Sequence, residues 1–191
     1  MNFGNYEIVE RLKTTYHAPR REPIAWIVVH YTGTAASGIA NARALEWPLK
    51  SPRSTHYFID GNMVYHCVDE RTRAAWHVGG VSQDKRIPVY NQNSIGVDLC
   101  ERKQDFITRL AVDKDWFFTK ETEQTAAEII AVLCLRYGID LDHVVRHYDV
   151  TRKLCPRPFV GIDKNSVYGE SGDLRWEKFK KRIGEFIEAK R

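Results

Sequence analysis

A short stretch in the C-terminal half of the chain, residues 146–159, carries three side chains that could do chemistry together. In "RHYDVTRKLCPRPF" a proton acceptor, a cation and a thiol fall within nine residues, as His147, Lys153 and Cys155. A second histidine, His30, ends the apolar run "IAWIVVH", and functional side chains collect at strand ends in α/β proteins. Two imidazoles and one thiolate are a competent zinc set, because three protein ligands leave a fourth position open for water. These residue types therefore indicate a catalytic rather than a structural metal site.

Other interpretations of the same residues stay open from the pattern alone. His147 and Cys155 could be a loop histidine and an incidental thiol. His143 and His147 stand four apart and could bind a metal as a helical pair without Cys155, although "LDHVV" is also typical of a segment entering the edge of the core. A structural zinc site would need a fourth ligand, for which His66, His77 and His143 are the candidates.

Length and composition indicate one globular domain. The chain has 191 residues, of which 43% are apolar and 28% charged, and this is ordinary for a soluble protein with a sizeable core. The longest apolar runs are far shorter than a membrane span, and the first residues lack the apolar segment of a secretory signal. We therefore expect a monomer without a membrane partner, held in the cytoplasm. The net charge of +4 suits an anionic partner such as a cell wall, but no dense Lys/Arg stripe favours nucleic acid.

The four cysteines, Cys67, Cys100, Cys134 and Cys155, form no CxxC pair. Without an export signal, we expect reduced thiols rather than a disulfide framework. Cys134 lies in an apolar helical run, and Cys67 and Cys100 lie in strand-like stretches, so these three are expected in the core. Cys155 stands apart, because its loop is polar and is an unusual place for a buried structural thiol.

The elements that must position these side chains alternate between strand and helix. Strands are expected where runs of β-forming residues end in turn signals: 24–33, 93–101, and a hairpin over 55–69 that turns at Asp60-Gly61. Helices are expected where apolar residues recur at helical spacing: 5–13, 37–47, 126–137 before Gly138, and about 173–190. The sequence therefore predicts a single α/β domain over residues 1–191, in which helices cover one sheet.

Five ordered segments carry a resemblance to a known family. They are "IVVHYTG", "STHYFIDGN", "AAWHVGG", "NSIGVDLCE" and "RHYDVTRKLCP", and together they cover roughly residues 24–159. In this order they resemble zinc-dependent N-acetylmuramoyl-L-alanine amidases of type 2, which are related to peptidoglycan recognition proteins and amidase-type phage endolysins. The resemblance implies a central mixed β-sheet flanked by α-helices, one zinc in a groove, and cleavage of the amide between N-acetylmuramic acid and L-alanine in peptidoglycan.

Carried over residue by residue, the resemblance implies His30, His147 and Cys155 as the zinc ligands. Lys153 falls where the family has a basic residue two positions before its third ligand, and it would stabilise the oxyanion. Asp98 falls where many relatives carry a Glu that handles the proton of the attacking water. Aspartate keeps the carboxylate but sets it back by roughly 1.5 Å, one carbon–carbon bond. A buried structural role for Asp98 is therefore the alternative.

Three more residues are candidates for contacts with the sugar or peptide: His56, Trp76 and His77. The alternative for His56 is a hydrogen-bonded core histidine, and for Trp76 it is packing beneath a glycine loop. Glu101 and Lys103 are expected at a solvated strand end.

Three functions are consistent with these residues. The first is zinc-dependent hydrolysis of the muramoyl–alanine amide, which would lyse the cell wall. The second is a non-catalytic peptidoglycan-binding module of the same fold, but such relatives typically lose the metal ligands, and Cys155 is present. The third is a cytosolic muropeptide-recycling amidase, in which the third ligand is often Asp. Cys155 therefore favours an endolysin-like enzyme, held in the cytoplasm until release and then acting on the bacterial cell wall.

Overall fold

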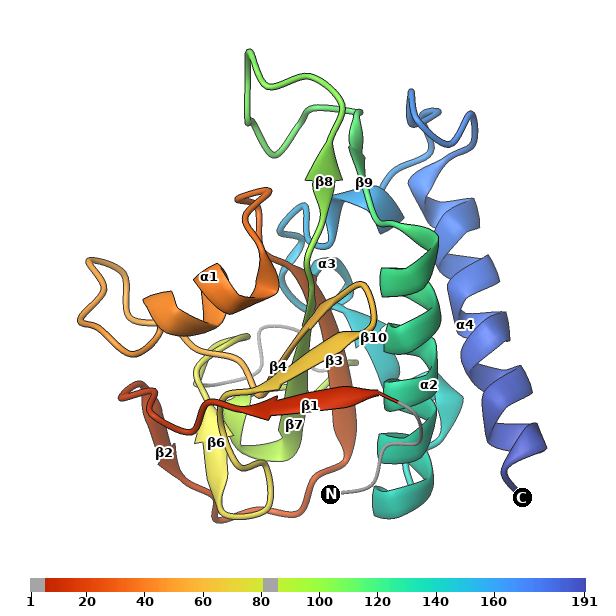
Figure 1. Cartoon of the computed structure of the whole chain (residues 1–191). Helices are drawn as coiled ribbons and strands as arrows, with labels where there is room; N and C mark the ends of the chain where they lie inside the picture. Colours follow the sequence, from red (N-terminus) through yellow and green to blue (C-terminus); the bar gives the residue numbers. More distant parts are fainter. Residues whose placement is uncertain (1–5, 81–85) are drawn as a thin grey trace.

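The computed structural model describes residues 6–80 and 86–191, and Figure 1 shows a central sheet with helices on both sides. The sheet has six strands in the order β1-β5-β4-β7-β3-β10, and every neighbouring pair is parallel except β4 and β5. The strands span Glu7–Glu10 (β1), Trp26–Tyr31 (β3), Tyr57–Asp60 (β4), Met63–His66 (β5), Ser94–Leu99 (β7) and Val144–Arg146 (β10). Two short antiparallel pairs lie outside this sheet: β2 (His17–Pro19) with β6 (Arg73–Ala75), and β8 (Arg102–Lys103) with β9 (Trp116–Phe117). The expected mixed sheet flanked by helices is confirmed.

Residue alternation along the central strands divides the sheet into a core face and a groove face. Ile27 and Val29 of β3 pack in the main core, whereas Val28 packs in a separate apolar cluster. Successive side chains of a strand point to opposite faces, so His30 shares the face of Val28. Because β3 and β7 are paired with His30 opposite Asp98, these two polar residues lie side by side on the groove face.

Helices α2 and α4 lie side by side over the core face (Figure 1). α2 spans Lys120–Tyr137 and ends at Gly138, whose φ of 64° is the left-handed conformation that glycine favours. It begins before Ala126, because the side-chain cap of Thr119, not the first apolar residue, sets its start. α4 spans Gly172–Ala189, as the amphipathic spacing predicts. No helix in the described part of the chain combines the length and apolar character needed to cross a bilayer.

Helix α1 (Gly38–Ala44) packs on the hairpin formed by β4 and β5. The hairpin turns at the Asp-Gly pair, as expected, with Gly61 at a φ of 59°. A Cβ on Gly38 would lie 2.5 Å from the ring of Tyr65, so α1 can approach this closely only because residue 38 has no side chain. The helix expected over 37–47 is confirmed in a shorter form.

The segment at 5–13 contains a strand, so the helix predicted there was wrong. β1 lies at the edge of the sheet and runs parallel to β5, with Ile8 beside Val64. Ile8 packs against the main core, while Val9 packs against the cluster under α1. Neighbouring apolar residues that serve opposite faces suit a strand, and a short apolar run does not distinguish strand from helix by its spacing.

Two charged residues after β7 are buried, so the interpretation of a solvated strand end was wrong. Glu101 is 0% exposed and Lys103 is 4% exposed. The Lys103 ammonium lies 2.6 Å from the carboxylate of Asp115 and 3.2 Å from that of Asp113. The Glu101 carboxylate accepts hydrogen bonds from backbone N–H groups in segment 32–35. These partners are distant in sequence, and paired charges can be buried where single ones cannot.

A further buried carboxylate, Glu70, lies at the centre of a polar cluster. It accepts hydrogen bonds from the hydroxyls of Tyr57 (2.7 Å) and Tyr137 (2.9 Å). Nε2 of His66 lies 3.1 Å from Glu70, and Nδ1 lies 2.8 Å from Glu10. Burial alone would raise the pKa of Glu70, but hydrogen bonds from His66 and Tyr57 outweigh it and lower that pKa. Burial would likewise lower the pKa of His66, but Glu70 and Glu10 outweigh it and raise that pKa.

The Glu70–His66 pair should make the free energy of unfolding decrease both as pH falls below an intermediate range and as pH rises above it. The stabilisation from Glu70, whose pKa is lowered, is present above its unfolded pKa and is lost as pH falls through the folded value. The stabilisation from His66, whose pKa is raised, is present below its unfolded pKa and is lost as pH rises through the folded value. We expect Glu70→Gln to reduce the free energy of unfolding by about 3–5 kcal/mol between roughly pH 4.3 and 6.5, and by less on either side. Urea unfolding of both proteins across this range measures the difference, and a pH-independent difference would contradict the pairing.

Candidate active site

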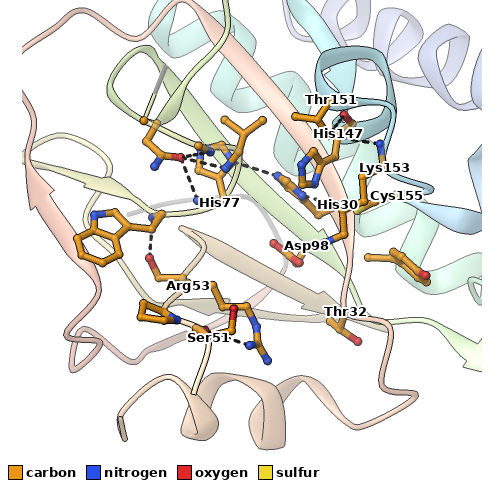
Figure 2. A pocket seen from close by; sticks show the side chains of 18 residues that line it. His30, Thr32, Ser51, Arg53, His77, Asp98, His147, Thr151, Lys153 and Cys155 are labelled. Atoms are coloured by element: carbon orange, nitrogen blue, oxygen red, sulfur yellow. Dashed lines mark hydrogen bonds between the residues drawn. The ribbon is translucent and has the colours of Figure 1, made fainter. Parts of the chain in front are cut away.

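A groove of about 710 Å³ opens on the groove face of the sheet. Its walls come from β3, from β7 and from three loops that are far apart in sequence, at 51–54, 76–80 and 151–155. Figure 2 shows His30 and Cys155 close together, with Asp98 between them and Arg53 in this view. The fold therefore brings together the residues that the sequence motifs singled out separately.

Three ligand-type side chains converge at one end of the groove: His30 from β3, His147 from the start of α3 (His147–Thr151), and Cys155 from the loop after α3. Their ligand atoms all lie within 4.8 Å of one another, and Sγ of Cys155 is 3.7 Å from Nδ1 of His30. Nδ1 of His147 is buried and has no hydrogen-bond partner among the described residues. A buried polar atom without a partner is costly unless a ligand satisfies it. This donor set fits a zinc ion with one open position.

Arg146 holds in place the segment that carries His147 and Cys155. The Asp149 carboxylate accepts hydrogen bonds from the backbone N–H of Arg146 and from its guanidinium, which caps α3. The guanidinium also donates to the carbonyl oxygen of Phe159 at 2.7 Å and to Asp173 at 2.6 Å. One partly buried cation thus ties the start of α3 to the start of α4.

Cys155 is 2% exposed, although the surrounding segment carries the charged residues Lys153 and Arg157. The backbone carbonyl of Cys155 accepts a hydrogen bond from the N–H of Tyr148 at 2.8 Å. This bond folds the loop back onto α3 and brings the thiol beside His30, while Lys153 stays exposed. The loop therefore buries one thiol even though it runs along the surface. All four cysteines are buried free thiols in the structure.

Burial favours the neutral forms of the groups in this cluster. It lowers the pKa of His147 to about 4, with the charge of Lys153 as the second cause. Burial, followed by the neighbouring His147 and His77, lowers the pKa of His30 well below its usual range. Burial also raises the pKa of the Cys155 thiol to about 12. Neutral imidazoles offer a lone pair to a metal, whereas the thiol must lose its proton, so metal binding would release a proton.

Asp98 lines the same groove and lies opposite His30 in the pairing of β7 with β3. Burial raises the pKa of Asp98 to about 7, although a hydrogen bond with Thr55 and the charges of Lys153 and Arg53 act in the opposite direction. A carboxyl group that titrates near neutral pH can both accept a proton and return it. The surroundings of Asp98 therefore suit proton transfer.

Two of the candidates for substrate contact differ sharply in position. Trp76 is 41% exposed, lines the groove, and has its ring 5.8 Å from that of Tyr16. His56 is fully buried and is not among the residues that line the groove. Its Nδ1 accepts a hydrogen bond from the N–H of Gly96 at 2.9 Å, and its Nε2 lies 3.3 Å from the carbonyl oxygen of Arg73. This position favours the alternative of a core histidine for His56.

Two groove residues, Arg53 and Asn91, had not been singled out from the sequence. Arg53 lines the groove beside Asp98 and contributes a second positive charge there. The side-chain oxygen of Asn91 accepts hydrogen bonds from three successive backbone N–H groups in segment 77–79. His77, at the start of this segment, lines the groove as expected. Neither Arg53 nor Asn91 stands in a distinctive local pattern, because both depend on neighbours far away in the chain.

Comparison with known proteins identifies the family of this chain. The sequence profile of the N-acetylmuramoyl-L-alanine amidase family matches residues 20–158. The N-acetylmuramoyl-L-alanine amidases CwlL of Bacillus licheniformis and BlyA of Bacillus subtilis are 36% identical over 149 residues and 32% identical over 153 residues, covering 70% and 73% of this chain. The chain spans 36% and 38% of the length of these two relatives. A mutant endolysin from Bacillus subtilis shares the fold, with a TM-score of 0.68 and 23% identity over 94% of this chain and 99% of that one. The chain belongs to the N-acetylmuramoyl-L-alanine amidase family.

Proposed function

We propose that this chain hydrolyses the amide between N-acetylmuramic acid and L-alanine in peptidoglycan and so degrades the bacterial cell wall. The family to which it belongs is named for this reaction, and the resemblance of its motifs to type-2 amidases implies a dependence on zinc. The observation that carries the proposal is the convergence of His30, His147 and Cys155 in one groove with Asp98. A module that only binds peptidoglycan would need the groove but would have no use for metal ligands beside an acid.

His30, His147 and Cys155 would hold one zinc ion through two imidazole nitrogens and a thiolate. A bound zinc acts as a Lewis acid and makes water a competent nucleophile near neutral pH. The three side chains come from β3, from α3 and from the loop folded onto α3. Regular elements hold such ligands more firmly than free loops do, which supports a preformed site.

Asp98 would accept the proton of the attacking water and return it to the amine of L-alanine as this group leaves. Its pKa of about 7 supports both steps, because a general base works best when its pKa is near the operating pH. Lys153 is exposed on the groove wall, and its charge already acts on Asp98 and His147. We assign Lys153 to the oxyanion that develops on the amide carbonyl, which a nearby cation stabilises.

Trp76 gives the groove an exposed aromatic wall. An indole ring can cover the apolar face of a sugar or an aliphatic side chain while its N–H stays available to polar groups. The groove volume of about 710 Å³ suits a ligand that carries both a sugar and a short peptide. These features support a muropeptide segment of peptidoglycan as the substrate.

A muropeptide-recycling amidase is the second candidate. Relatives of that type often use Asp as the third ligand, so Cys155 supports the lytic type. The likeness of the fold to an endolysin supports the same choice. We therefore propose an endolysin-like monomer that is held in the cytoplasm until release and then acts on the cell wall.

Digestion of purified peptidoglycan tests the bond that is cut. We expect new free amino groups on L-alanine and no new reducing sugar ends, because the amide is broken and the glycan strand is not. Mass analysis of the released fragments measures both products, with Cys155→Ser as the inactive control. New reducing ends without new amino termini would mean a glycosidase and would overturn the proposal.

The purified protein should contain about one zinc per chain. Cys155→Ser should weaken zinc binding by more than about 100-fold, the upper end for loss of a supporting partner, since a hydroxyl is a poor substitute for a thiolate. Cys134→Ser replaces a buried thiol in α2, away from the groove, and is the matched control that should bind zinc normally. Chelator competition and elemental analysis measure the affinity. Protein that holds no zinc after reconstitution would show the ligand assignment to be wrong.

Asp98→Asn should lower turnover by roughly 10²–10⁴-fold with zinc still bound, because it keeps the shape and removes the proton acceptor. Asp98 must be ionised to act, so wild-type activity should rise as pH increases through its pKa of about 7. This limb of the rate profile should flatten in the variant. Lys153→Met should lower turnover by roughly 10²–10³-fold and keep the limb. Profiles of rate against pH, with zinc content checked at each pH, measure these effects. Normal turnover in Asp98→Asn together with loss of turnover in Glu101→Gln would show that the base is Glu101.

A further inference from the structure

A chain of hydrogen-bonding groups runs from His30 into the interior of the protein. The groups in this chain beyond His30 have no role in the proton transfer or the zinc binding proposed above. Nε2 of His30 lies 3.0 Å from Nδ1 of His77, and Nε2 of His77 lies 3.1 Å from the hydroxyl oxygen of Ser94. The Ser94 hydroxyl in turn donates to the backbone carbonyl of Tyr90 at 2.6 Å. Figure 2 shows His77 beside His30, with a dashed line joining the rings.

The Tyr90 carbonyl, at the inner end of this chain, determines which group donates and which accepts in each of its hydrogen bonds. The Tyr90 carbonyl can only accept, so it takes the one proton of the Ser94 hydroxyl. Ser94 must then accept from the N–H at Nε2 of His77. A neutral imidazole carries one proton. The His77 ring lies against the imidazoles of His30 and His56, and among the described residues its ring nitrogens have His30 and Ser94 as hydrogen-bond partners and no carboxylate, which favours the neutral form. Its Nδ1 is therefore an acceptor.

The same logic fixes the proton on His30. Because Nδ1 of His77 accepts, Nε2 of His30 carries the proton and donates it. Nδ1 of His30 is then left with its lone pair, and this is the nitrogen that lies 3.7 Å from Sγ of Cys155. The chain therefore selects the tautomer in which the free nitrogen faces the other metal ligands.

Three contacts hold His77 itself in position, one through its backbone and two through its ring. Its backbone N–H is one of the three that donate to Asn91, at 3.0 Å. Its ring lies against Gly96, where an added Cβ would come within 2.7 Å of it. Ser94 anchors the far nitrogen. Both ring nitrogens are thus used inside the protein, which leaves neither for the substrate contact expected from the sequence.

We propose that His77, anchored by Ser94, is a positioning residue that holds His30 in the tautomer and orientation required to bind zinc. This inference rests on the proposed zinc ligands. It assigns His77 a role through His30 and in place of contact with the sugar or peptide. Partners of this kind, which donate to or accept from the outer nitrogen of a metal-bound histidine, typically change metal affinity by roughly 10–100-fold when removed.

The test compares two substitutions at one position. His77→Phe keeps a ring of similar size and removes the acceptor, so it should raise the zinc dissociation constant by roughly 10–100-fold. His77→Gln retains an amide oxygen that can accept from His30, so it should bind zinc more tightly than His77→Phe. Ser94→Ala should weaken zinc binding to a smaller extent. The His77 side chain remains beside His30 in this variant, but its Nε2 loses the hydrogen bond to the Ser94 hydroxyl. His143→Phe is the matched control, because His143 packs on Trp26 outside the groove, and its zinc affinity should be unchanged.

Two measurements separate positioning from a general structural role. Chelator competition gives the zinc affinity of each variant, and NMR shifts of the ring nitrogens give the tautomer of His30 in zinc-free protein. Wild type should show the proton at Nε2 of His30, and His77→Phe should show a mixture. Equal zinc affinity in wild type and His77→Phe, or a proton at Nδ1 of His30 in wild type, would overturn the inference. Wild-type protein that binds no zinc would instead overturn the proposed function, and the His30 tautomer would still decide the role of His77.

Discussion

The parallel pairing of β3 with β7 is the constraint on which the groove depends. This register sets His30 opposite Asp98 and, one position earlier, Val29 opposite Val97. Both valines are fully buried in the main core. A slip of one residue would turn every side chain of a strand to the other face, so the burial of the valines also fixes the face on which His30 and Asp98 stand. The apolar core therefore determines the position of the candidate site.

Two polar side chains near the ends of β7 hold loops in place beside the sheet. Glu101, two residues after the end of β7, accepts hydrogen bonds from segment 32–35, which follows β3. Asn91, just before β7, does the same for segment 77–79. Loops have too few apolar residues to form a core of their own, and their backbone N–H groups need partners. One side chain that satisfies three such groups holds a loop in place, so residues on irregular segments can be positioned precisely.

The sequence predicted those parts of this arrangement whose signal is local. The β-branched run of β3, the Asp-Gly hairpin and the helix stop at Gly138 all depend on residues within one element. The convergence of His30, His147 and Cys155 was predictable because His147 and Cys155 lie within nine residues of each other and His30 lies near the end of a strand. Prediction failed where the deciding partner is remote in the chain. β1 is a strand because β5 pairs with it, and Glu101 is buried because segment 32–35 donates to it.

The aspartate at position 98 illustrates how the fold tunes a group that the motif alone leaves ambiguous. Burial pushes the pKa of Asp98 upward, while Thr55, Lys153 and Arg53 push it down, and the balance lies at about 7. A carboxyl group whose pKa lies near neutral pH can both take and return a proton. The shorter side chain also loses less rotamer freedom than a glutamate when it is held in place. Aspartate at this position therefore exchanges roughly 1.5 Å of reach for a better-ordered carboxylate, which suits a residue whose backbone already lies beside that of His30.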